Sequence, residues 1–117
     1  VPISRLVECI SWAEKEVNKL GLTAPMVGHV GDGNFHSIVL YDPHDKEKQK
    51  KIRQYSDDLI NKALELEGTI TGEHGIGLQK KHYLLKEHLD NLPVMKAIKR
   101  SLDTNNIMNP GKVFDLN

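Results

Sequence analysis

The fold of this chain is decided by the stretch GHVGDGNFH, residues 28–36. Residues rich in Val, Ile, Phe and Tyr flank it, and they predict strands over 26–30 and 34–41. Asp-Gly is a preferred pair for a two-residue hairpin turn, so we predict that turn at Asp32-Gly33. The segment is therefore expected to form an antiparallel hairpin.

The predicted hairpin brings two histidines close together. Counting outward from a two-residue turn places His29 opposite His36, and side chains opposite each other point to the same side about 4.5–5.5 Å apart. Two imidazoles so placed can share one divalent metal, because each metal–nitrogen bond is about 2 Å long. The alternative is a glycine-rich hairpin whose histidines are merely neighbours, and the pattern alone leaves both interpretations open.

A second motif, GEHGIG, occupies residues 72–77 and follows a predicted short strand over 69–71. Glu73 can complete a His/His/carboxylate ligand set that leaves metal positions open for substrate oxygens. Adjacent side chains on extended backbone point to opposite faces, so we expect Glu73 and His74 to do different jobs. His74 would then be available as a general base. The alternative is an exposed Glu-His pair on a flexible loop.

The rest of the chain predicts helices around these motifs. A helix over 4–20 has Ser4 as its cap and Gly21 as its stop, with Cys9 buried in its apolar pattern. A second helix opens at Asp42-Pro43 and ends at Gly68. A third lies near 92–103, with Ile98 and Leu102 facing inward. These elements predict an α+β fold, with helices packed on one face of a small antiparallel sheet.

Length and charge exclude several classes of protein. A chain of 117 residues fits one domain with a single modest core, and 16 basic residues balance 16 acidic ones. No field favours nucleic acid or an anionic membrane surface. No apolar stretch is long enough to cross a bilayer. The chain begins with Val1-Pro2 instead of Met, so we expect it to be a piece of a longer polypeptide.

Three motifs in order, GHVGDGNFH, TGEHGIG and LDTNNIMNPGKVF, resemble the carboxyl-terminal domain of FAD-linked oxidases. The resemblance runs from about His29 to Phe114. It implies that residues 1–117 are the carboxyl-terminal part of a substrate- and metal-binding domain. A flavin-binding domain is then expected upstream, and the fragment alone is expected to be inactive.

The resemblance also implies roles for individual residues. His29, His36 and Glu73 would bind zinc or manganese, which holds the hydroxyl and carboxylate of a 2-hydroxyacid. His74 would be the catalytic base that removes the hydroxyl proton while FAD accepts hydride. Asn109 lies in the terminal Asn-Pro-Gly segment that returns toward the flavin. Gln79-Lys80-Lys81 stands where a Gly-Lys-Arg type sequence is frequent, and its lysines receive no role.

Within the family, the first motif and the residues after it look most like mitochondrial enzymes that oxidise D-lactate to pyruvate. Ile38 stands where 2-hydroxyglutarate enzymes tend to carry asparagine, and an apolar side chain suits a short aliphatic substrate. Glycolate and D-2-hydroxyglutarate dehydrogenases remain alternatives, as does a non-catalytic metal-binding module. The resemblance implies an electron acceptor such as cytochrome c. It implies a mitochondrial location in a eukaryote, and otherwise a cytoplasmic or membrane-associated one.

Overall fold

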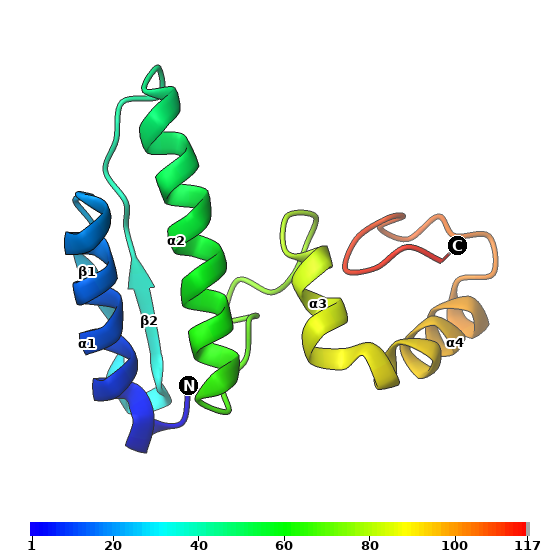
Figure 1. Ribbon diagram of the computed structural model, residues 1–117. Helices are drawn as coiled ribbons and strands as arrows, with labels where there is room; N and C mark the ends of the chain where they lie inside the picture. The colour runs from blue at the N-terminus through cyan, green and yellow to red at the C-terminus, as the bar shows by residue number, and fades with distance from the viewer. Residues whose placement is uncertain (117) are drawn as a thin grey trace. The chain divides into compact units, whose positions relative to one another are not determined.

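A computed structural model describes residues 1–116, and the chain divides into two compact units, Val1–Thr69 and Ile70–Asn117. Figure 1 shows α1 and α2 running alongside the β1–β2 hairpin in the first unit, and α3 and α4 in the second. The elements in chain order are α1 (Ile3–Leu20), β1 (Met26–His29), the 3-10 helix η1 (Val30–Asp32), β2 (Asn34–Ser37), α2 (Lys46–Glu65), α3 (Lys81–His88), the 3-10 helix η2 (Leu89–Asn91) and α4 (Leu92–Leu102).

Helix α1 closely follows the sequence prediction, except at its start. It begins at Ile3, and the capping position is held by Pro2 without a side-chain hydrogen bond. The expected cap at Ser4 is therefore wrong, because this residue already lies in the first turn. The predicted stop is confirmed: Gly21 takes a left-handed conformation with φ of 66°. Cys9 is completely buried, as predicted, and burial raises the pKa of its thiol.

The core of the first unit forms where α1 and α2 meet one face of the hairpin. Its centre consists of Val17, Leu22 and Tyr55, which expose 7%, 8% and 2% of their surface. Partly buried apolar residues pack around this centre: Leu20, Ala24, Met26, Val39, Ile52 and Leu59. The fold is thus α+β with helices on one face of a small antiparallel sheet, which confirms the predicted class.

A buried hydrogen bond fastens the hairpin to α2. The Tyr55 hydroxyl donates to the Ser37 hydroxyl at 2.8 Å. Burial raises the pKa of the Tyr55 phenol, so the hydroxyl stays protonated and able to donate. The face of β2 that carries Ser37 is therefore the one that faces the helix.

Helix α2 begins later and ends earlier than predicted. Asp42 and Pro43 lie in a turn closed by the Asp45 N–H donating to the Asp42 carbonyl. The helix then begins at Lys46, because the Asp45 side chain accepts from the Lys48 N–H at 2.9 Å. A standard N-cap thus outweighs proline as the opening signal. At the other end α2 stops at Glu65, three residues before the predicted Gly68.

The second unit differs more from expectation. No strand forms over 69–71 in the part of the chain that the structure describes, and α3 was not predicted. Helix α4 matches the prediction in its bounds and in the position of Pro93 in its first turn. Its apolar residues were placed wrongly, since Ile98 and Leu102 are 55% and 79% exposed instead of inward-facing. Among residues 1–116, no helix is long and apolar enough to cross a bilayer.

Asp103 organises the chain after α4. Its side chain is buried, and its two oxygens accept the N–H groups of Ile107 and Met108, each at 2.9 Å. The Lys99 ammonium donates to the same carboxylate. These donors, Lys99 first, lower the pKa of Asp103 below its ordinary value.

Removing the hydroxyl that fastens the hairpin is expected to loosen the first unit. Tyr55→Phe should lower the free energy of unfolding by about 0.5–1.5 kcal/mol, the usual net worth of one hydrogen bond. Urea denaturation measures the effect, with Tyr41→Phe as the control because Tyr41 is 45% exposed. Ser37→Ala combined with Tyr55→Phe should cost less than the sum of the single changes. Equal effects at Tyr55 and Tyr41 would contradict the anchoring role.

The lowered pKa of Asp103 predicts that the second unit becomes less stable in acid. Because its folded pKa lies below its ordinary value of 3.8, the carboxylate contributes stability at and above that pH. This contribution is lost as the pH falls through the lowered folded pKa. Asp103→Asn should therefore be less stable than the wild type at pH 7, and the difference should shrink below about pH 4. Denaturation curves across pH test this, and a difference that stays constant down to pH 2 argues against it.

Candidate metal centre

The two histidines of the first motif lie on one face of the hairpin. In the observed register His29 pairs with Asn34, and Val27 pairs with His36. The histidines are therefore diagonal neighbours, not directly opposite partners. Their ring centroids are 6.1 Å apart, and the ring planes meet at 84°.

The predicted two-residue turn is wrong. Residues 30–33 connect the strands, with η1 followed by Gly33, whose N–H donates to the Val30 carbonyl at 3.2 Å. Gly33 has φ of 69°, and a Cβ there would lie 2.0 Å from the Val1 carbonyl oxygen, so only glycine fits. The register differs from the predicted one by two positions. Because side chains alternate with a period of two, the histidines still share a face.

That shared face is the one turned away from the helices. Met26 and Val39 pack toward the core and Ser37 bonds to α2, so alternation puts His29 and His36 on the opposite, outer face. His29 is exposed and His36 is half-buried. Both imidazole rings therefore lie on a face that is accessible to solvent.

Apolar side chains share the outer face with the histidines. Val27, directly paired with His36, is 55% exposed. The pairing continues to an isolated bridge between Thr23 and Leu40, in the same register. Ile38 and Leu40 follow His36 at steps of two and are 48% and 56% exposed. The outer face therefore combines two imidazoles with an exposed apolar strip.

The histidine pair fits a divalent metal. A centroid separation of 6.1 Å leaves room between the rings for one ion, bound about 2 Å from a nitrogen of each. Imidazole nitrogens suit zinc and other borderline cations, and a carboxylate extends the set to harder ions such as manganese. The residues present are thus suitable ligands for either metal that the sequence resemblance implies.

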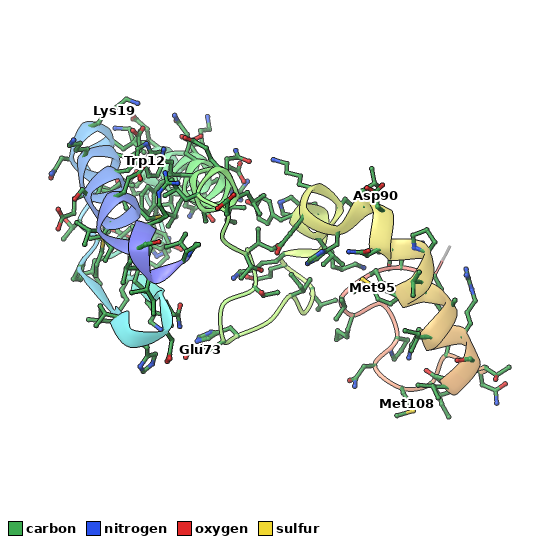
Figure 2. All side chains as sticks on the ribbon, turned by 90° about the horizontal axis from the view of Figure 1, so that it is seen from below. Trp12, Lys19, Glu73, Asp90, Met95 and Met108 are labelled. Atoms are coloured by element: carbon green, nitrogen blue, oxygen red, sulfur yellow. The ribbon has the colours of Figure 1, made fainter. Side chains whose placement is uncertain are left out.

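Glu73 and His74 lie together in the second unit, in the loop before α3. The side chain of Glu73 extends from this loop (Figure 2). The His74 Nε2 lies 3.3 Å from the Glu73 Oε1, and the two side chains are 75% and 44% exposed. The expectation that they point to opposite faces is wrong, because residues 72–74 form a turn and not extended backbone. The carboxylate is therefore positioned to orient the imidazole beside it.

Asn109 lies in the tail after α4, where Met108 is also seen (Figure 2). It adopts φ of 47°, a left-handed conformation that asparagine tolerates, and its carbonyl accepts the Lys112 N–H at 3.3 Å. An open cavity of about 310 Å³ lies here. Its lining residues include Lys99, Asn106, Asn109 and Phe114. Asn109 thus lines a mostly apolar hollow in the tail.

Sequence reasoning missed the residues that hold these segments in place. Tyr55 received no individual role from the sequence, although its hydroxyl anchors the strand next to His36. Asp103 was given no role, although an aspartate at a helix end followed by polar residues is a recognisable capping signal. For Lys80 and Lys81 the sequence held no signal, since exposed lysines are common before a helix.

The comparisons with known proteins identify the family. Residues 1–113 match the family described as FAD linked oxidases, C-terminal domain, so the chain belongs to that family. It is 46% identical to a probable mitochondrial D-lactate dehydrogenase of Danio rerio, over 99% of this chain and 24% of that protein. It is 43% identical to a mitochondrial D-lactate dehydrogenase [cytochrome] of Arabidopsis thaliana, over 97% of this chain and 20% of that protein.

A further relative carries a different substrate in its name. The glycolate oxidase subunit GlcD of Bacillus subtilis is 37% identical over 97% of this chain and 24% of that protein. The chain thus spans between a fifth and a quarter of the length of these three relatives.

The histidine pair predicts a metal-binding defect that changes at His29 or His36 should cause and a change at the exposed His44 should not. His29→Ala or His36→Ala should weaken zinc binding by more than about 100-fold, since losing even an outer-shell partner costs about 10- to 100-fold. His44→Ala, a change in an exposed turn, should leave affinity unchanged. Competition against a chromogenic chelator measures this. Equal affinity in all three variants would remove the histidine pair from any metal site.

Proposed function

We propose that this chain is the substrate-side part of a flavin-dependent dehydrogenase that oxidises D-lactate to pyruvate. The observation that carries the proposal is the histidine pair on the exposed outer face of the hairpin, in a chain that belongs to the FAD-linked oxidase family. A flavin-binding domain elsewhere in a longer polypeptide is part of the proposal. The named relatives, of which this chain spans only a part, support it.

Three residues are proposed to hold the metal. His29 and His36 supply two nitrogens, and Glu73 supplies a carboxylate oxygen, which together make a donor set suited to zinc or manganese. When bound, the ion supplies a positive charge that fixes the hydroxyl and carboxylate of a 2-hydroxyacid and makes the hydroxyl more acidic.

His74 is the proposed catalytic base. Its imidazole takes the proton from the substrate hydroxyl, and the neighbouring Glu73 carboxylate, 3.3 Å away, orients the ring. When bound, FAD supplies the acceptor for the hydride that leaves C2 of the substrate. Asn109, which lines the hollow in the tail, is proposed to contact the flavin.

The choice of D-lactate follows from the apolar strip beside the histidines. Val27, Ile38 and Leu40 expose about half of their surface on this face. They offer a methyl group apolar contact, whereas a second carboxylate would lose hydration there without gaining a partner. Glycolate is the alternative that a specific observation favours, since a glycolate oxidase subunit is among the relatives. A D-2-hydroxyglutarate dehydrogenase and a non-catalytic metal-binding module are the remaining alternatives.

The electron acceptor and the compartment complete the proposal. Relatives named as mitochondrial D-lactate dehydrogenase [cytochrome] support cytochrome c as the acceptor and the mitochondrion as the location in a eukaryote. The balanced charge of the chain, with 16 residues of each sign, offers no basis for binding nucleic acid.

The proposed chemistry predicts dye reduction that depends on D-lactate and on metal. The full-length protein should reduce a redox dye with D-lactate, lose this activity on chelation, and regain it with zinc or manganese. Activity that survives thorough chelation would remove the metal from the reaction. Turnover of glycolate or D-2-hydroxyglutarate in place of D-lactate would overturn the substrate assignment.

The proposed base makes a separate prediction. His74→Gln should lower kcat by about 10²- to 10⁴-fold, the usual contribution of general base catalysis. It should leave metal affinity near that of the wild type, because His74 is not among the proposed ligands. Exposed His44→Gln is the matched control and should keep full kcat. A His74→Gln enzyme with wild-type kcat would show that the proton leaves by another route.

A further inference from the structure

Ile70 precedes the loop that carries Glu73 and His74, and two charged side chains hold its backbone. Ile70 exposes only 4% of its surface. Its N–H donates to the Glu87 Oε2 at 3.1 Å, and its carbonyl accepts from the Lys80 Nζ at 3.0 Å. A neighbouring strand would normally satisfy such backbone groups. Here Lys80 and Glu87 take the place of that strand.

The same loop is held at its exit. Ile76 is buried at 8% exposure, and its carbonyl accepts the Lys80 N–H at 3.3 Å. The Gly77 carbonyl accepts the Val113 N–H at 2.8 Å, so the tail of the chain contacts this end. Lys80 therefore contacts both ends of the loop, the entry through its side chain and the exit through its backbone.

The tail that reaches Gly77 is tied in turn to the start of α3. The Lys81 Nζ donates to the Gly111 carbonyl at 3.0 Å and to the Asp115 Oδ1 at 2.6 Å. Val113 has φ of 68°, which is strained for a β-branched residue. Such a conformation persists only where surrounding contacts enforce it. The contacts made by Lys81 and by the Val113 N–H are of this kind.

The loop is rich in glycine, which is costly to hold in one conformation. Gly72, Gly75 and Gly77 all adopt positive φ, and glycine gives up more conformational freedom on ordering than any other residue. The Glu73 and His74 side chains are too exposed to be fixed by packing. The hydrogen bonds that hold Ile70 involve charged side chains, and such bonds are stronger than those between neutral groups. The Glu87 side chain is only 13% exposed. Fixing the loop ends therefore limits the positions that Glu73 and His74 can take.

We propose that Lys80 is a positioning residue, which together with Glu87 fixes the backbone of Ile70 and thereby places Glu73 and His74. The proposal deepens the proposed function and rests on it for the roles of Glu73 and His74. It assigns a role to a lysine that received none in the sequence prediction. Lys80 acts through the backbone and touches neither substrate nor cofactor.

Hydrogen exchange of the loop amides, with steady-state kinetics on the same protein, tests the proposal. In the full-length enzyme, Lys80→Met should speed exchange in residues 71–77 and leave exchange in α1 and α2 unchanged. It should lower kcat by up to about 100-fold, the cost of displacing a catalytic group by about 1 Å. Lys80→Arg, which keeps the cation, should restore most of both. Lys50→Met, on the exposed surface of α2, is the matched control and should change neither.

Two outcomes overturn the proposal. Unchanged loop exchange in Lys80→Met shows that Lys80 does not hold the loop. Faster exchange with wild-type kcat and zinc affinity shows a structural contact with no positioning role. If Lys80→Met unfolds, faster exchange everywhere will reveal it, and Glu87→Gln then decides, because it should loosen the same amides from the other side. A wild-type enzyme that does not oxidise D-lactate overturns the proposed function. Hydrogen exchange of the loop amides still tests whether Lys80 and Glu87 hold the loop.

Discussion

A single register of backbone pairing determines what the first unit can do. It runs from the bridge between Thr23 and Leu40 to the pair His29 and Asn34. Alternation along this ladder sends one set of side chains into the core and the other to the outer face. A slip of one position would bury both imidazoles among apolar side chains and expose the residues of the core. The core and the candidate metal centre therefore depend on the same constraint.

The α2 helix enforces that register from the inner face. Tyr55 is nearly fully buried, so its hydroxyl must find a partner, and Ser37 is that partner. A strand slipped by one position would present the imidazole of His36 or the apolar side chain of Ile38 to the same hydroxyl. Packing alone tolerates substitution among apolar residues, whereas a buried polar pair is satisfied in one alignment only. This hydrogen bond thus adds specificity to the stability that the core provides.

The sequence predicted the elements with strong periodicity and missed those that depend on tertiary contacts. The apolar spacing in α1 and the proline in α4 placed both helices within one residue of their observed bounds. Helix α3 buries only Tyr83 and Leu84 and has no apolar stripe, so no pattern signalled it. Ile98 and Leu102 form an apolar pattern. The pattern alone does not determine whether another element packs against these side chains and buries them.

The candidate site was predicted in part, for physical reasons that can be named. The shared face of His29 and His36 was recovered although the turn was wrong, because a shift of two positions preserves the face. The relation of Glu73 to His74 was missed, because the prediction assumed extended backbone where three residues form a turn. The role of Lys80 lies in hydrogen bonds to main-chain atoms, and main-chain acceptors leave no mark on a sequence.

The second unit is held together differently from the first. Lys80, Lys81 and Asp103 each bind main-chain groups of loops, and Lys81 and Asp103 also pair with a charged side chain. Main-chain donors and acceptors remain when the loop residues are replaced, so the loop sequence can change without loss of the main-chain contacts. A unit with little apolar core thus keeps a defined backbone path through its longest irregular segments.

The short connection between the two histidines bears on the order of events during folding. Hairpins form in about 1–10 μs, because closing a short loop costs little entropy. His29 and His36 are brought together by such a local contact, across residues 30–33. Contacts between residues far apart in the chain form in a slower class of event. The two histidine ligands of the proposed site thus meet early, and a nascent chain can bind an ion weakly through them alone.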